Sequence, residues 1–153
     1  MKMKDGVEIL LVEDNMSDAE LTIRALRRNN LANNLLHVKN GAEALNFIFA
    51  EGMYSGRNPI WAPKIILLDL KMPKMDGLQV LAAIRGAEST NKIPVVMLTS
   101  SREDPDIDAC YRLGANSYIV KPVEFENFTK IVTDLAFYWL LHNQAPGHMR
   151  LHP

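Results

Sequence analysis

Five short apolar runs recur along the chain, each bounded by polar or turn-forming residues. Four runs are strong, and a weaker one lies at residues 35–38. The strong runs are at residues 7–12, 65–68, 93–98 and 118–120. Successive apolar positions are typical of strands that are buried on both faces, as in a parallel sheet covered by helices on either side. The pattern therefore predicts five buried strands.

Segments with helical spacing separate these predicted strands. Ser17 is suited to cap a first helix that carries Leu21, Ala25 and Leu26, and Glu20 completes a capping box. Apolar stripes at helical spacing also follow the other runs, within residues 41–50, 78–84, 107–113 and 125–139. Strand and helix thus alternate five times, which predicts an α/β fold with a doubly wound, five-stranded parallel sheet.

Two segments interrupt this alternation. Residues 51–63 (EGMYSGRNPIWAP) are rich in Gly and Pro and predict an enlarged loop before the third strand. Residues 144–153 (QAPGHMRLHP) predict a flexible tail. A length of 153 residues is that of a single domain, so we expect one domain over residues 1–143 and a tail over residues 144–153.

The composition excludes some classes of protein but does not indicate a reaction. Apolar residues make up 48% of the chain, charged residues make up 23%, and the net charge is −1, so no overall basic field predicts a nucleic-acid partner. No apolar stretch approaches the roughly 18 residues of a membrane span. Cys110 is the single cysteine, which fits a reducing compartment. We therefore expect a cytoplasmic protein without a membrane or nucleic-acid partner.

Polar residues that can bind a metal or take part in a reaction follow the strong runs. Glu13 and Asp14 follow the first run, Asp69 the next, and then Thr99 and Lys121. The carboxyl ends of parallel strands lie along one edge of a sheet, where ligands bind. Three carboxylates brought together repel one another and raise each other's pKa, and a hard divalent cation relieves that repulsion. The arrangement predicts a Mg²⁺ site with one carboxylate free to react.

The sequence resembles the receiver domains of two-component response regulators over about residues 7–141. Four motifs in the expected order carry the resemblance: LLVEDN at 10–15, LLDLKMPKMDG at 67–77, VVMLTSS at 95–101 and SYIVKP at 117–122. It implies a flavodoxin-like (βα)5 fold with strand order 2-1-3-4-5. The long loop before the third strand and the final helix running into FYWLLHNQ are similar to single-domain regulators that partner phytochrome-type histidine kinases.

The resemblance implies roles for the residues at the strand ends. Asp69 is the phosphoacceptor, whose carboxylate attacks the phosphorus of a phosphohistidine on a sensor histidine kinase. Asp14 binds Mg²⁺ directly, Glu13 binds it through water, and Asp69 and the backbone carbonyl of Lys71 complete the ligand set. The chain itself is then a signalling phosphoacceptor and not an enzyme for a separate substrate.

The same resemblance implies a switch around the phosphoryl group. Thr99 donates a hydrogen bond to that group, Lys121 pairs with Asp69 or with a phosphoryl oxygen, and Tyr118 turns inward as the aromatic switch. The bond from Lys121 to Pro122 is cis in the family. Lys71 and Ser101 lie two residues beyond Asp69 and Thr99, and such neighbours tune how fast the phosphoryl group is lost. Neither obviously orients a water molecule, so we expect slow self-dephosphorylation.

A receiver without an output domain must signal through its surface. Residues 136–141 (AFYWLL) are more apolar than a solvated helix needs. With Tyr118, they predict a homodimer through the face made by the fourth helix, the fifth strand and the fifth helix. The alternative is that this segment packs on the domain's own core.

Three other functions fit the sequence less well than a receiver does. Phosphatases and mutases with an Asp nucleophile resemble IILLDLK locally, but they need a second Asp where Lys71 stands, and a substrate cap. A flavodoxin-type module needs a phosphate cradle after the first strand, where Glu13 and Asp14 would repel phosphate. A degenerate receiver would bind partners without phosphorylation, and the intact acidic set argues against it.

Overall fold

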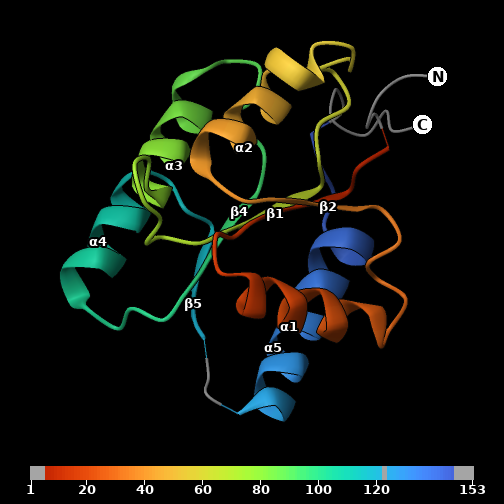
Figure 1. Ribbon diagram of the computed structural model, residues 1–153, viewed down its shortest axis with the longest axis vertical. Helices are drawn as coiled ribbons and strands as arrows, with labels where there is room; N and C mark the ends of the chain where they lie inside the picture. The colour runs from red at the N-terminus through yellow and green to blue at the C-terminus, as the bar shows by residue number, and fades with distance from the viewer. Residues whose placement is uncertain (1–5, 122–123, 147–153) are drawn as a thin grey trace.

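The computed structural model describes residues 6–121 and 124–146 and contains a parallel sheet of five strands in the order β2-β1-β3-β4-β5 (Figure 1). The strands are β1 (Ile9–Val12), β2 (Leu35–Val38), β3 (Ile65–Leu68), β4 (Val95–Thr99) and β5 (Ser117–Val120). Each strand overlaps one of the five apolar runs: β1 and β4 begin two residues later than their runs, β4 ends one residue later, and β5 begins one residue earlier. The predicted α/β fold class and strand order are confirmed.

Helices cover both faces of the sheet (Figure 1). They are α1 (Met16–Arg27), α2 (Gly41–Ile48), α3 (Gly77–Gly86), α4 (Asp104–Arg112) and α5 (Phe125–Phe137), with a short 3-10 helix η1 (Gly52–Tyr54) and a π-helical turn η2 (Tyr138–His142). One face packs against α1 and α5, and the other against α2, α3 and α4. Among the described residues, no helix has the length and apolarity that crossing a membrane requires.

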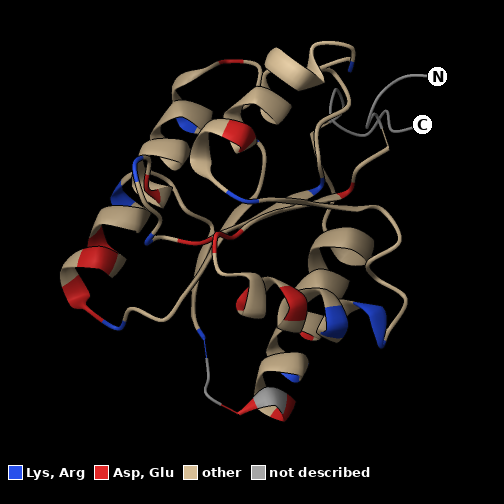
Figure 2. Ribbon diagram, viewed as in Figure 1, with Lys and Arg blue, Asp and Glu red and all other residues tan. Residues whose placement is uncertain are grey.

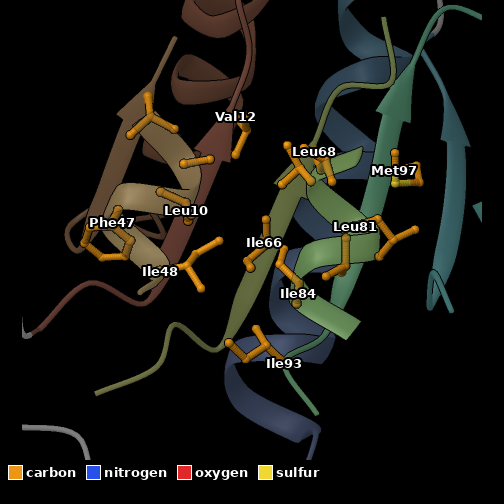
Figure 3. Close-up of a cluster of buried hydrophobic side chains, with 14 of the residues drawn as sticks. Leu10, Val12, Phe47, Ile48, Ile66, Leu68, Leu81, Ile84, Ile93 and Met97 are labelled. Atoms are coloured by element: carbon orange, nitrogen blue, oxygen red, sulfur yellow. The ribbon is translucent and has the colours of Figure 1, made fainter. Parts of the chain in front are cut away.

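Alternate residues of each central strand pack into two separate apolar clusters. Leu10 and Val12 of β1 point to the α2 and α3 side, together with Ile66 and Leu68 of β3 (Figure 3). Their sequence neighbours pack instead with α1 and α5. This two-sided burial is the physical reason that β1 and β3 have no polar position.

The start of α1 differs from the prediction. Asn15 and not Ser17 caps the helix, and its side chain accepts a hydrogen bond of 3.0 Å from the backbone N–H of Asp18. Both Asn and Ser are good caps, and the helix begins two residues earlier than predicted because Asn15 already follows the short loop after β1. The described residues place a capping box on α3 instead, formed by Asp76 and Gln79. Gly114 follows the C-cap of α4, Leu113, with a φ of 97°, a conformation that glycine adopts readily.

The enlarged loop at 51–63 is an ordered element built around a buried arginine. Arg57 is 3% exposed, and its guanidinium donates to the carbonyl oxygens of Phe47 (2.7 Å) and Trp61 (2.6 Å). It also lies 4.2 Å from the centre of the Phe47 ring, against which Tyr54 packs edge-on. Arg57 therefore binds the loop to the last turn of α2.

The apolar end of the last helix divides between the core and the solvent. Ala136 is buried, and Trp139 and Leu140 pack against the cluster beneath α1 and α5. Tyr138 and Leu141 are exposed, at 51% and 61%. Only part of the segment predicted to form an interface is therefore available to a partner.

Residues 144–153 were predicted to form a flexible tail, and only the first three are described. Within that part, Ala145 packs against the apolar cluster on the α2 and α3 side. Residues 147–153 lie outside the described residues, as do Pro122 and the Lys121–Pro122 bond.

Candidate functional site

The sheet register brings the first acidic residues together. Val12 of β1 pairs with Leu68 of β3, so the next residue on each strand, Glu13 and Asp69, lies at the same level of the sheet edge. The backbone N–H of Asp69 donates to the carbonyl of Val12 at 3.0 Å, which extends the pairing into the site. In Figure 2, the acidic segments that follow β1 and β3 meet near the centre of the view.

Three carboxylates converge at this edge. One oxygen each from Glu13, Asp14 and Asp69 lies within 4.8 Å of the others. Glu13 and Asp69 are 1% and 7% exposed, whereas Asp14 faces solvent. A partly open cluster of hard oxygen ligands fits a divalent cation that keeps some of its waters. The predicted metal-binding carboxylates are thus brought together.

Burial and mutual repulsion hold a proton in this cluster. Desolvation by burial, reinforced by the Asp69 carboxylate, raises the pKa of Glu13 to about 8. Burial also raises the pKa of Asp69, although a hydrogen bond with Glu13, the charge of Lys121 and a hydrogen bond with the backbone of Lys71 oppose that shift. Because the two carboxylates interact directly, they titrate as a pair.

The lysine at the end of β5 lies inside the site, where it is bound to two carboxylates other than that of Asp69. The Nζ atom of Lys121 donates to Glu13 at 2.5 Å and to Asp18 at 2.9 Å. Burial alone would lower the pKa of Lys121, but these two hydrogen bonds and the charge of Asp69 raise it overall. Lys121 thus acts on Asp69 through its charge, and direct pairing with Asp69 is replaced by pairing with its neighbour.

The threonine and the aromatic residue predicted as a switch are linked through one loop residue. Thr99 is buried, at 1% exposure, and its hydroxyl oxygen accepts a hydrogen bond of 3.4 Å from the backbone N–H of Ser101. The hydroxyl of Tyr118 donates to the carbonyl of Ser101 at 3.0 Å. Tyr118 is half-buried and packs against the core on the α3 and α4 side. The loop after β4 therefore holds both side chains.

Two residues that were not among the predicted site residues also support the site. Asp18 shares the ammonium of Lys121, and the Nε2 atom of His37 lies 2.8 Å from the carbonyl oxygen of Glu13. His37 is on β2, next to β1, so it holds the peptide that joins Glu13 to Asp14. Asp18 carries a weak signal, since it lies in the first turn of the helix that follows the acidic pair. His37 in an apolar strand carries none.

Cation binding to the cluster is expected to strengthen as pH rises. A cation must displace the proton that Glu13 and Asp69 hold, since the pKa of Glu13 is about 8. Below about pH 8, each pH unit should weaken the apparent Mg²⁺ affinity by up to about tenfold, and the dependence should level off above that pH. Isothermal titration from about pH 6 to about pH 9 measures this slope. A Glu13→Gln variant should flatten it, and an equally steep slope in that variant would contradict the assignment.

Sequence comparison places the same residues in a known family. The response regulator receiver domain family matches residues 9–133. The probable methanogenesis regulatory protein FilR2 of Methanothrix harundinacea is 38% identical over 148 residues, which cover 96% of this chain and 92% of FilR2. Response regulator Rcp1 of Synechocystis is 36% identical over 132 residues, which cover 86% of this chain and 88% of Rcp1.

Solved structures agree with the sequence comparison. The phosphorylated cyanobacterial phytochrome response regulator RcpA superimposes with a TM-score of 0.83 at 36% identity, covering 91% of this chain and 97% of RcpA. The Mn²⁺-bound form of Rcp1 superimposes with a TM-score of 0.81 at 34% identity, covering 91% of this chain and 98% of that one. The resemblance to receivers, including those linked to phytochromes, is confirmed, and the alternatives of a capped phosphatase and a flavodoxin-type module are set aside.

Proposed function

This chain belongs to the response regulator receiver family, and on that premise we propose that it accepts a phosphoryl group from a sensor histidine kinase onto Asp69. The observation that carries the proposal is the position of Asp69 at the end of β3. Its carboxylate lies against Glu13 and Asp14 and stays at the opening of the site, with 7% of the residue exposed. A buried acid cluster of this kind is unfavourable unless a cation or a reaction uses it.

The proposed step is an in-line transfer. A carboxylate oxygen of Asp69 attacks the phosphorus, the bond between phosphorus and the histidine nitrogen breaks, and that nitrogen leaves with its electron pair. Carboxylates are weak nucleophiles, so the protein contributes mainly by positioning and by neutralising charge on the phosphoryl oxygens. Mg²⁺ held by Asp14, Asp69 and the Lys71 carbonyl, with Glu13 through water, would supply positive charge to those oxygens.

Lys121 and Thr99 supply the remaining contacts in this proposal. The ammonium of Lys121 is held by Glu13 and Asp18 next to Asp69, and its flexible stem allows it to follow the charge onto the phosphoryl group. The hydroxyl of Thr99 has the Ser101 N–H as a donor to its oxygen, which leaves its own proton available for a phosphoryl oxygen. Tyr118 follows because it is bound to the same loop.

The proposed function also identifies the partner that donates the phosphoryl group. The donor is a sensor histidine kinase, and the similarity to the phytochrome response regulator RcpA favours a phytochrome-type kinase in the cytoplasm. We propose that the chain acts as a signalling phosphoacceptor, with no separate substrate, no nucleic acid and no membrane to bind.

Phosphorylation by a small donor tests the proposal without the kinase. Incubation with acetyl phosphate and Mg²⁺ should add the mass of one phosphoryl group, and peptide mapping should find it on Asp69. Chelation of the metal with EDTA should suppress the reaction. Stable addition to another residue, or addition that continues at the same rate in EDTA, would contradict the proposal.

The exposed apolar residues on the last elements favour a homodimer as the route of output. Tyr111 of α4, Ile131 of α5, and Tyr138 and Leu141 of η2 are between 37% and 61% exposed. Aromatic and aliphatic residues of this kind are characteristic of the centre of an interface. We propose that two copies associate through the face formed by α4, β5 and α5.

Sedimentation velocity over a concentration series, with and without acetyl phosphate, measures this association. A variant with Tyr138→Ser and Leu141→Ser should remain monomeric where the wild type dimerises. Met53→Ser removes an equally exposed apolar side chain, at 67% exposure, from the 51–63 loop and should leave the dimer intact. A wild type that stays monomeric at every concentration and phosphorylation state would contradict the proposed interface.

A further inference from the structure

One carboxylate on α4 joins the two loops that border the phosphoacceptor. Asp106 lies in the first turn of α4 and accepts a hydrogen bond of 2.6 Å from the hydroxyl of Ser101. The ammonium of Lys71 lies 3.3 Å from the same carboxylate. The hydroxyl of Ser101 and the charge of Lys71 hold the pKa of Asp106 below its usual range. The three side chains form a bridge that we call the Asp106 bridge.

The bridge lies just beyond the reacting residues. Lys71 comes two residues after Asp69, and Ser101 comes two residues after Thr99. Because β3 and β4 are neighbouring strands, with Leu68 opposite Met97, the loops that follow them leave the sheet edge side by side. A link between the two loops therefore spans the space beside the carboxylate that carries the phosphoryl group.

The bridge is fixed on its α4 side and on its β5 side. The backbone N–H of Glu103 donates to the hydroxyl oxygen of Ser101 at 3.3 Å, and the hydroxyl of Tyr118 donates to the Ser101 carbonyl at 3.0 Å. Ser101 is thus oriented by three neighbours, and the side chain of Asp106 is only 22% exposed. Lys71 is 65% exposed, so its ion pair depends on the fixed position of the carboxylate and adds little stability alone.

We propose that Asp106 is a positioning residue that lengthens the life of the phosphoryl group on Asp69, an inference that rests on the proposed function. Loss of the phosphoryl group needs a water oxygen to attack phosphorus as the bond to the Asp69 oxygen breaks. The water's proton passes to solvent, and inorganic phosphate leaves. Asp106 holds Lys71 and Ser101 across the gap between the loops. In this position neither side chain opens a path for the attacking water, and neither orients that water toward phosphorus.

The test compares the phosphoryl half-life of matched variants. Each protein is phosphorylated with acetyl phosphate and Mg²⁺, the donor is removed by rapid desalting, and the decay is followed by intact mass. We expect Asp106→Ala to shorten the half-life by about threefold or more. A threefold change lowers the barrier to loss of the phosphoryl group by about half of the 1.36 kcal/mol that a tenfold change requires. Asp108→Asn removes the same charge from an exposed position on the same helix and should leave the half-life unchanged.

A double-mutant cycle separates positioning from a general loss of structure. If Lys71 and Asp106 act through one bridge, then Lys71→Gln combined with Asp106→Asn should decay no faster than the quicker single variant. Additive effects in the cycle, or a half-life in Asp106→Ala equal to or longer than that of the wild type, would overturn the inference. A midpoint of thermal unfolding matching that of Asp108→Asn would show that Asp106→Ala is folded, so its half-life decides the matter. If the wild type gains no phosphoryl group, the proposed function itself fails, which distinguishes the two failures.

Discussion

An Asp69→Asn variant is expected to take up no phosphoryl group from acetyl phosphate or from a kinase, and at the same time to unfold at a higher temperature than the wild type. The loss of phosphorylation follows because the amide oxygen is a far weaker nucleophile than the carboxylate. The gain in stability is the less obvious half of the prediction. It follows from the position of Asp69 in a buried cluster of like charges.

The energetic reason lies in the partners of Asp69. Its carboxylate contributes to holding the pKa of Glu13 at about 8, so in the absence of a cation the folded protein holds a proton that the unfolded chain releases near pH 4.5. Lys121 keeps its hydrogen bonds to Glu13 and Asp18 when Asp69 is neutralised, so no buried cation is left unpaired. We therefore expect a gain of about 1 kcal/mol in the metal-free protein.

The pH dependence gives this prediction a definite sign. Because the folded pKa of Glu13 is raised, its unfavourable contribution is absent below the unfolded value of 4.5 and grows as pH rises toward about 8. The stabilisation by Asp69→Asn should follow the same course and be larger near pH 8 than near pH 5. Chemical denaturation in EDTA at several pH values measures it. Asp108→Asn controls for the change in net charge, and a destabilised Asp69→Asn protein at pH 8 would contradict the argument.

The Gly77→Ala variant is expected to lose about 3 kcal/mol of stability and most of its capacity for phosphorylation. Gly77 begins α3, and its backbone N–H donates to the carbonyl of Leu70 at 2.8 Å. A methyl group at this position would press on the carbonyl oxygen of Asp69 and lie 2.9 Å from the Cα atom of Leu70. Both contacts are with backbone, which has no rotamer to move away.

The variant should affect chemistry as well as folding because the displaced backbone is that of Asp69, the proposed phosphoacceptor. A shift of the Asp69 carbonyl changes where its carboxylate meets Glu13 and Asp14, and small misplacements of a reacting group have large effects on rate. Gly86→Ala is the matched control on the same helix, since a methyl group there meets no atom within 4 Å. It should change stability by no more than about 1 kcal/mol, toward greater stability. Thermal unfolding and the rate of labelling by acetyl phosphate measure both effects, and equal behaviour of the two variants would refute the close-contact argument.

The strands and the acid cluster were predictable because each depends on a rule that the sequence displays directly. Buried parallel strands need consecutive apolar residues, and their carboxyl ends share one edge, so Glu13, Asp14 and Asp69 converge whatever the details of the helices. The helices were predictable from helical spacing in the same way, since α2, α3, α4 and α5 overlap the apolar stripes within residues 41–50, 78–84, 107–113 and 125–139.

The contacts that the sequence did not predict depend on where a long side chain ends and on which of several equivalent residues makes the contact. Lys121 enters a site with several carboxylates, and nothing in its neighbours along the chain tells which of them it binds. Asn15 and Ser17 are both good caps, and the length of the turn after β1 decides between them. Asp104, Asp106 and Asp108 look alike in the sequence as acids near the start of a helix, but among the residues that the structure describes only Asp106 contacts both Ser101 and Lys71.

The contact of Arg57 with Phe47 makes the 51–63 loop and the end of α2 one structural unit. A chimera that replaced this loop with the short connection of another receiver would leave the carbonyls of Phe47 and Ile48 without their guanidinium donor and would uncover an aromatic ring. Such an exchange should therefore succeed only when helix and loop are transplanted together. The length of this loop is thus tied to the residues of α2 on which it rests.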